Sequence, residues 1–154
     1  MAALDLADLR TSYERDGVVR VPGAFDAHWV ATLVDAFDRL MARVKAGEKL
    51  APDSALGPEH GRPDGDFDAR TGRGHLRYAA VHDAALARWL RESPAAALVG
   101  ELTGSTRVQF WYDLWFCKEP APADGATPWH HDATGHPFTG SAIPSLWIAL
   151  TDVG

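Results

Sequence analysis

Apolar side chains recur every three or four residues near the start of the chain, which is the period of an amphipathic helix. The clearest run spans residues 30–44, with Asp26 before it as a helix N-cap and Gly47 after it. A shorter run at residues 6–13 leads to Gly17, and the valine-rich residues 18–21 follow it. The pattern therefore predicts two helices with a short strand between them.

The helical period disappears between residues 51 and 74, where glycine and proline are frequent, so we predict a long loop there. Two further helices are predicted at residues 84–91 and 94–102, the second ending before Gly104. Residues 108–117 are rich in aromatic side chains and predict a strand buried on both faces. Asp113 lies in this run, and a carboxylate among aromatic rings must be paired or hydrogen-bonded. Residues 145–153 predict another strand.

Length and composition limit the kind of protein. The chain has 154 residues, 46% of them hydrophobic, which is enough for one core and predicts a single domain over residues 1–154. Its helical part reaches about residue 105, and its strands occupy about residues 106–154. A formal net charge of −6 without any lysine or arginine cluster argues against nucleic-acid or membrane partners. Cys117 is the single cysteine, and no apolar run is long enough to span a bilayer, so we expect a cytoplasmic protein.

The segment Trp129-His130-His131-Asp132 carries the candidate chemistry. If it is a strand, the side chains of His130 and Asp132 emerge on one face about 6.6 Å apart, where one ion could bridge them. One imidazole and one carboxylate are two thirds of the facial triad that binds non-haem Fe(II). His131 would point to the opposite face as an outer residue, and His136, between Gly135 and Pro137, would lie on a loop.

Three stretches give these residues a family context, namely residues 118–120 (Lys-Glu-Pro), 127–132 and 145–153. Together with residues 13–23 they resemble the phytanoyl-CoA dioxygenase family, whose members are Fe(II)- and 2-oxoglutarate-dependent oxygenases. The resemblance implies a mainly β fold with N-terminal helices, in which the core is a double-stranded β-helix, the cupin-like jelly roll. It also implies that O₂ and a small-molecule substrate are the reaction partners.

The resemblance further implies roles for individual residues. His130 and Asp132 would be metal ligands, and Trp147 and Lys118 would contact 2-oxoglutarate, with no catalytic residue beyond the metal ligands. Two alternatives stay open, because Trp147 could be an ordinary core aromatic and Lys118 the charged end of a strand.

Two residues that the family uses are not found after the motif in this sequence. The second histidine ligand is expected on a later strand, and no arginine that could anchor 2-oxoglutarate occurs after Arg107. A jelly roll also needs about eight strands, more than the pattern provides. We therefore expect the chain to be the N-terminal part of a jelly roll, incomplete at its C-terminal side.

The resemblance implies hydroxylation of a C–H bond in a small-molecule or acyl substrate, and the sequence does not choose the substrate. One alternative is a catalytically inactive fragment or binding module of the same fold. Another is a zinc hydrolase that uses His130, His136 and a carboxylate.

Overall fold

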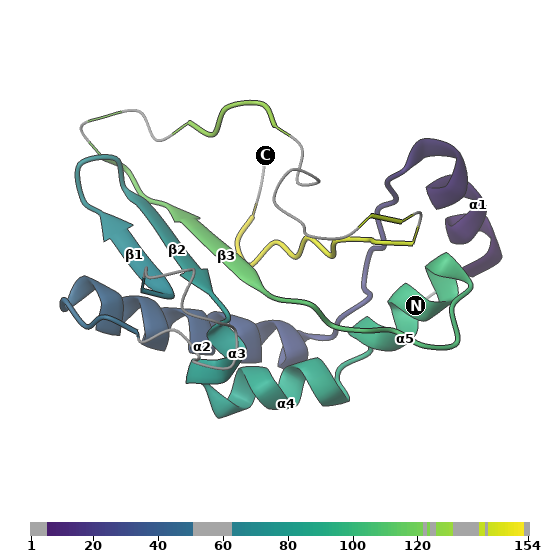
Figure 1. Cartoon of the computed structure of the whole chain (residues 1–154), viewed down its shortest axis with the longest axis horizontal. Helices are drawn as coiled ribbons and strands as arrows, with labels where there is room; N and C mark the ends of the chain where they lie inside the picture. The colour runs from purple at the N-terminus through teal and green to yellow at the C-terminus, as the bar shows by residue number, and fades with distance from the viewer. Residues whose placement is uncertain are drawn as a thin grey trace.

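The computed structural model describes residues 6–50, 63–121, 123, 126–130, 139–140 and 142–152. These residues form one antiparallel sheet and a set of helices, the longest of which lies along one side of the sheet (Figure 1). The helices are α1 (Leu6–Asp16), α2 (Ala27–Lys45), α3 (Ala79–His82), α4 (Ala84–Glu92) and α5 (Ala95–Thr103), and the strands are β1 (Gly65–Asp68), β2 (Arg73–Arg77) and β3 (Leu114–Lys118). None of the helices in the described ranges is both long and apolar enough to cross a bilayer.

The predicted helices are confirmed together with the residues that end them. The Asp26 carboxylate accepts a hydrogen bond of 3.0 Å from the backbone N–H of Trp29 and caps α2. Gly17 follows α1 and Gly104 ends α5, both with the positive φ that glycine adopts without strain. Helix α3 was not predicted, because at four residues it is too short to show a period.

The sheet has the strand order β1-β2-β3, and α2 packs against β1 and β2. Alternation along the strands assigns each residue to one of two faces. Leu76 of β2 is fully buried under α2, and its partner in the register is Trp115 of β3. The Trp115 ring stacks on Phe37 of α2, with centroids 6.0 Å apart. We call this the covered face.

The buried core lies between α2 and the covered face. Its α2 contribution repeats at helical spacing, and the other members come from the strands and the later helices, giving the cluster Leu33, Ala36, Leu40, Met41, Val44, Leu50, Leu76, Ala79, Leu86, Trp89 and Ala95. Helix α4 packs against α2, and α1 packs against α5.

The strand predictions need four corrections. Residues 18–21 form no strand, and Val18 is exposed. Strands β1 and β2 lie inside the segment predicted as a loop, of which residues 51–62 are outside the described part of the chain. In residues 108–117 the strand begins only at Leu114, and one of its faces is exposed. Residues 145–152 are assigned to no strand. A strand exists only where a neighbour completes its hydrogen-bond ladder, and β-type residues alone do not supply that neighbour.

The described residues form more helix than strand, since α2 alone has 19 residues and the three strands have four, five and five. The mainly β character is thus not seen in this part of the chain. The small antiparallel sheet is compatible with a cupin-like fold, and the complete jelly roll stays a prediction.

Gly72, in the turn between β1 and β2, provides a test of the sheet. Its φ is +64°, and a Cβ there would overlap the carbonyl oxygen of Glu119. Gly17 has a similar φ of +71° with open space around it, so Gly17→Ala isolates the conformational cost of about 1–2 kcal/mol. We expect Gly72→Ala to lower the free energy of unfolding by about 1–3 kcal/mol more than Gly17→Ala in urea titrations. Equal losses would show that the turn does not approach β3 this closely.

Candidate functional site

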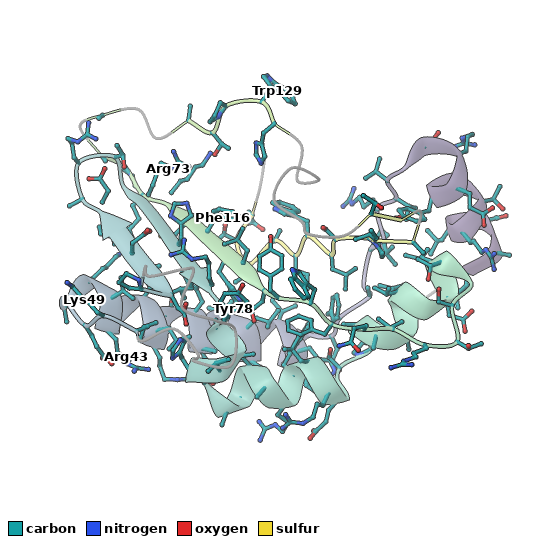
Figure 2. All side chains as sticks on the ribbon, viewed as in Figure 1. Arg43, Lys49, Arg73, Tyr78, Phe116 and Trp129 are labelled. Carbon is teal, nitrogen blue, oxygen red and sulfur yellow. The ribbon has the colours of Figure 1, made fainter. Side chains whose placement is uncertain are left out.

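No helix in the described part of the chain covers the face of the sheet opposite α2, and this face carries most of the polar side chains of the sheet. Alternation places on it the side chains of Asp66, Asp68, Arg73, His75, Arg77, Leu114, Phe116 and Lys118. Figure 2 shows Arg73 and Phe116 on the side of the sheet away from α2. We call this surface the open face.

One row of the open face runs across all three strands. Asp66 of β1 is the register partner of His75 of β2, which is in turn the partner of Phe116 of β3. The His75 Nδ1 and the Asp66 carboxylate are 2.8 Å apart, and the His75 and Phe116 rings meet edge to face at 5.2 Å. This row is therefore held by its own contacts, although the Phe116 side chain remains 57% exposed.

Lys118, predicted to contact the co-substrate, is the last residue of β3 and lies on the open face. Its register partner on β2 is Arg73. The neighbouring Glu119 forms an ion pair with Lys45 of α2, so that carboxylate is directed to the covered side. Lys118 accordingly presents its ammonium group to solvent at the edge where the chain leaves the sheet.

His130 lies in the segment that follows β3 and is exposed. Its Nδ1 is 2.9 Å from the carbonyl oxygen of Pro128, which can only accept, so Nδ1 carries the hydrogen. In a neutral ring the lone pair is then on Nε2, the nitrogen that would bind a metal. In metal-binding histidines, the ring nitrogen that does not bind the metal usually donates its hydrogen to a carboxylate, a backbone carbonyl or water.

The strand expected at residues 129–132 is wrong for the two described residues, since neither Trp129 nor His130 belongs to a strand. Asp132, His131 and His136 lie outside the described residues. Among the residues that are described, no group of three or more His, Cys, Asp or Glu side chains could hold a metal ion. The donor chemistry of His130 fits a metal ligand, and the pairing with Asp132 stays a prediction.

Trp147, the other predicted co-substrate contact, is 76% exposed and is not a core residue. Ile148 and Leu150 pack against the core cluster, so alternate residues of this segment point inward. Lys118 and Trp147 make no hydrogen bond or ring contact with each other in the described part of the chain. Their joint role at one site stays a prediction.

Asp113 fixes the start of β3. Its carboxylate accepts hydrogen bonds from the backbone N–H of Ala79 at 2.7 Å and from the Trp115 indole N–H at 2.8 Å. The prediction that this acid is paired or hydrogen-bonded is confirmed, and the residue is partly buried. Tyr78, whose φ is +52°, donates its own N–H to the Asp113 carbonyl at 3.1 Å. Burial raises the pKa of the Asp113 carboxyl, and the hydrogen bonds oppose that rise.

Sequence reasoning missed the β2 residues of the open face, Arg73 and His75. A signal was present, because residues 73–77 read Arg-Gly-His-Leu-Arg, with polar and apolar positions alternating as in a half-buried strand. The alternation was not recognised because glycine is frequent on either side of this run.

The comparisons with known proteins agree with the motif. The sequence profile of the family described as phytanoyl-CoA dioxygenase (PhyH) matches residues 13–154, which include every predicted site residue. No curated protein and no solved structure shows a significant match to the chain.

The raised pKa of Asp113 predicts a pH effect on stability. The folded chain holds the Asp113 proton more tightly than the unfolded chain, so this contribution is complete below the ordinary aspartate pKa of about 4 and is lost as the pH rises through the raised value. Asp113→Asn removes the titration. Subtracting the unfolding free energy of the variant from that of the original chain should give a value that falls as the pH rises above about 4.

Urea titrations at a series of pH values measure this difference. Asp38→Asn, at an exposed carboxyl of α2, is the matched control for the substitution itself. A difference for Asp113→Asn that does not vary with pH, or that rises with it, would contradict the assignment.

Proposed function

Because the chain belongs to the phytanoyl-CoA dioxygenase family, we propose that it acts as an Fe(II)- and 2-oxoglutarate-dependent dioxygenase that hydroxylates a C–H bond of a small-molecule or acyl substrate. The observation that carries the proposal is the family match over residues 13–154, which contain the whole histidine-aspartate motif. O₂ is the second partner of this reaction. The assignment of residues 1–154 to one cytoplasmic jelly-roll domain stays a prediction.

In the proposed site His130 and Asp132 would hold the iron. The hydrogen bond from His130 Nδ1 to the Pro128 carbonyl supports this role, because it orients the ring and sets the tautomer before metal arrives. When bound, Fe(II) and 2-oxoglutarate supply the oxidising chemistry, in which O₂ gives one oxygen atom to the substrate and one to succinate, with release of CO₂.

Lys118 and Trp147 would act on 2-oxoglutarate. The exposed ammonium of Lys118 attracts a dicarboxylate, and the exposed indole of Trp147 offers a flat apolar wall against which its carbon chain can lie. The aromatic side chains beside them would help to exclude water from the reacting centre.

Metal titration tests the assignment of His130. We expect His130→Ala to lower the Fe(II) affinity of the chain at least about tenfold in the presence of 2-oxoglutarate, because one ligand is lost. Anaerobic titration, followed by the visible absorption of 2-oxoglutarate chelated to Fe(II), gives the affinity. His131→Gln is the matched control and should retain it.

Similar losses in His130→Ala and His131→Gln would contradict the assignment of His130, and not His131, as the metal ligand. A chain that binds 2-oxoglutarate equally well with and without Fe(II) would indicate a binding module of the same family.

A further inference from the structure

The basic side chains on and beside the open face differ in whether they have a partner. The Arg77 guanidinium donates to the carbonyl oxygen of Pro63 at 2.6 Å. His75 is paired with Asp66 at 2.8 Å. At the hairpin turn, the Arg70 guanidinium is 3.5 Å from the Asp68 carboxylate, which also accepts a hydrogen bond of 3.0 Å from the Thr71 hydroxyl.

Arg73 and Lys118 differ from these residues in having no such partner among the described residues. They are register partners on adjacent antiparallel strands and both lie on the open face. In the part of the chain that the structure describes, neither side chain has an ion pair or a hydrogen bond to a carboxylate. Asp68, the β1 residue in the same row, is instead engaged by the turn through Arg70 and Thr71.

Like charges placed directly opposite each other on a sheet repel, because their Cβ atoms are only about 4.5–5.5 Å apart. The Asp68 carboxylate, the register partner of Arg73 on β1, offsets part of this repulsion, but its oxygens are already hydrogen-bonded to the turn. An anion between the Arg73 and Lys118 side chains would remove the repulsion that is left. The planar guanidinium of Arg73 can bind a carboxylate through two parallel hydrogen bonds, and Lys118 adds a third donor.

The surface next to the pair is apolar. Phe116 and Leu114 follow Lys118 on the same face of β3 at two-residue steps, and their side chains are 57% and 39% exposed. The stripe from Lys118 to Leu114 is about 13 Å long at the rise of a strand. It therefore joins a cationic end to an aromatic and then an aliphatic surface.

We propose that Arg73 and Lys118 bind the free carboxylate of an organic acid whose apolar part lies against Phe116. The inference rests on the proposed function in one respect, because it takes an organic acid of this kind to be the substrate that the enzyme oxidises. The net charge of −6 disfavours polyanions, and Asp66 and Asp68 on the same face favour a single carboxylate over a phosphate dianion.

The probe is 3-phenylpropanoate, with 3-phenylpropanol as its uncharged counterpart, and calorimetry on the metal-free chain measures both affinities. We expect the acid to bind more tightly than the alcohol and its affinity to fall with added salt. Arg73→Gln and Lys118→Gln should each weaken binding of the acid at least about fivefold, with little effect on the alcohol. Arg73→Lys should lose part of the affinity, because it keeps the charge without the fork.

Lys49→Gln is the matched control, because it removes one exposed cation near the end of α2, away from the open face (Figure 2). It should leave binding of the acid unchanged. Without ligand, Arg73→Gln should melt at the same temperature as the original chain or higher, since it relieves repulsion. A structural role for Arg73 would instead lower the melting temperature.

The same titrations with 2-oxoglutarate separate the two possible sources of the carboxylate. Because Lys118 is also the residue proposed to contact 2-oxoglutarate, Arg73→Gln is the variant that separates the two carboxylates. Losses in Arg73→Gln that are confined to 2-oxoglutarate would assign the pair to the co-substrate and overturn the proposal, as would equal losses in Lys49→Gln. Since the phenylpropanoate measurement uses no metal, its failure is distinguishable from a failure of Fe(II) binding at His130.

Discussion

The close packing of α2 on one face of the sheet is the constraint on which the other features depend. Glycines at the contact allow this approach, because a Cβ at Gly65 would lie 2.5 Å from Val44 Cγ2 and one at Gly74 would lie 2.9 Å from Met41 Cε. Once α2 covers this face, alternation along the strands sends every second side chain to the other one. The open face thus follows from the packing of the core, and it is where charged, aromatic and histidine side chains come together.

The two ends of the sheet are fixed by different interactions. At the start of β3 the partly buried Asp113 carboxylate joins the first N–H groups of α3 to the Trp115 indole. At the end of β3 the Lys45–Glu119 ion pair joins α2 to the residue that follows the strand, and Lys45 also lies 4.5 Å from the centre of the Phe67 ring. A strand held at both ends presents Phe116 and Lys118 in a defined orientation, which a binding surface requires.

The sequence predicted what local signals determine and missed what distant contacts determine. Helix α2 was predictable because its apolar period and its N-cap Asp26 are both local features of the sequence. Strands β1 and β2 were not predicted, because four or five residues rich in glycine and charge are stable only through pairing and through α2. At the site, the family motif identified Lys118 and His130, whereas Arg73 became visible as the neighbour of Lys118 only through the register with β3.

The most direct test asks whether a metal bound at His130 lies over the open face, on the side where Figure 2 shows the neighbouring Trp129. Mn(II), a paramagnetic ion with ligand preferences close to those of Fe(II), broadens the NMR signals of nearby side chains. Leu114 and Leu76 lie near the same end of the sheet, on the open and covered faces respectively. We expect the Phe116 ring and the Leu114 methyl groups to broaden well before those of Leu76, with the effect lost in His130→Ala. Equal broadening on both faces, or stronger broadening at Leu76, would contradict a metal site on the open face.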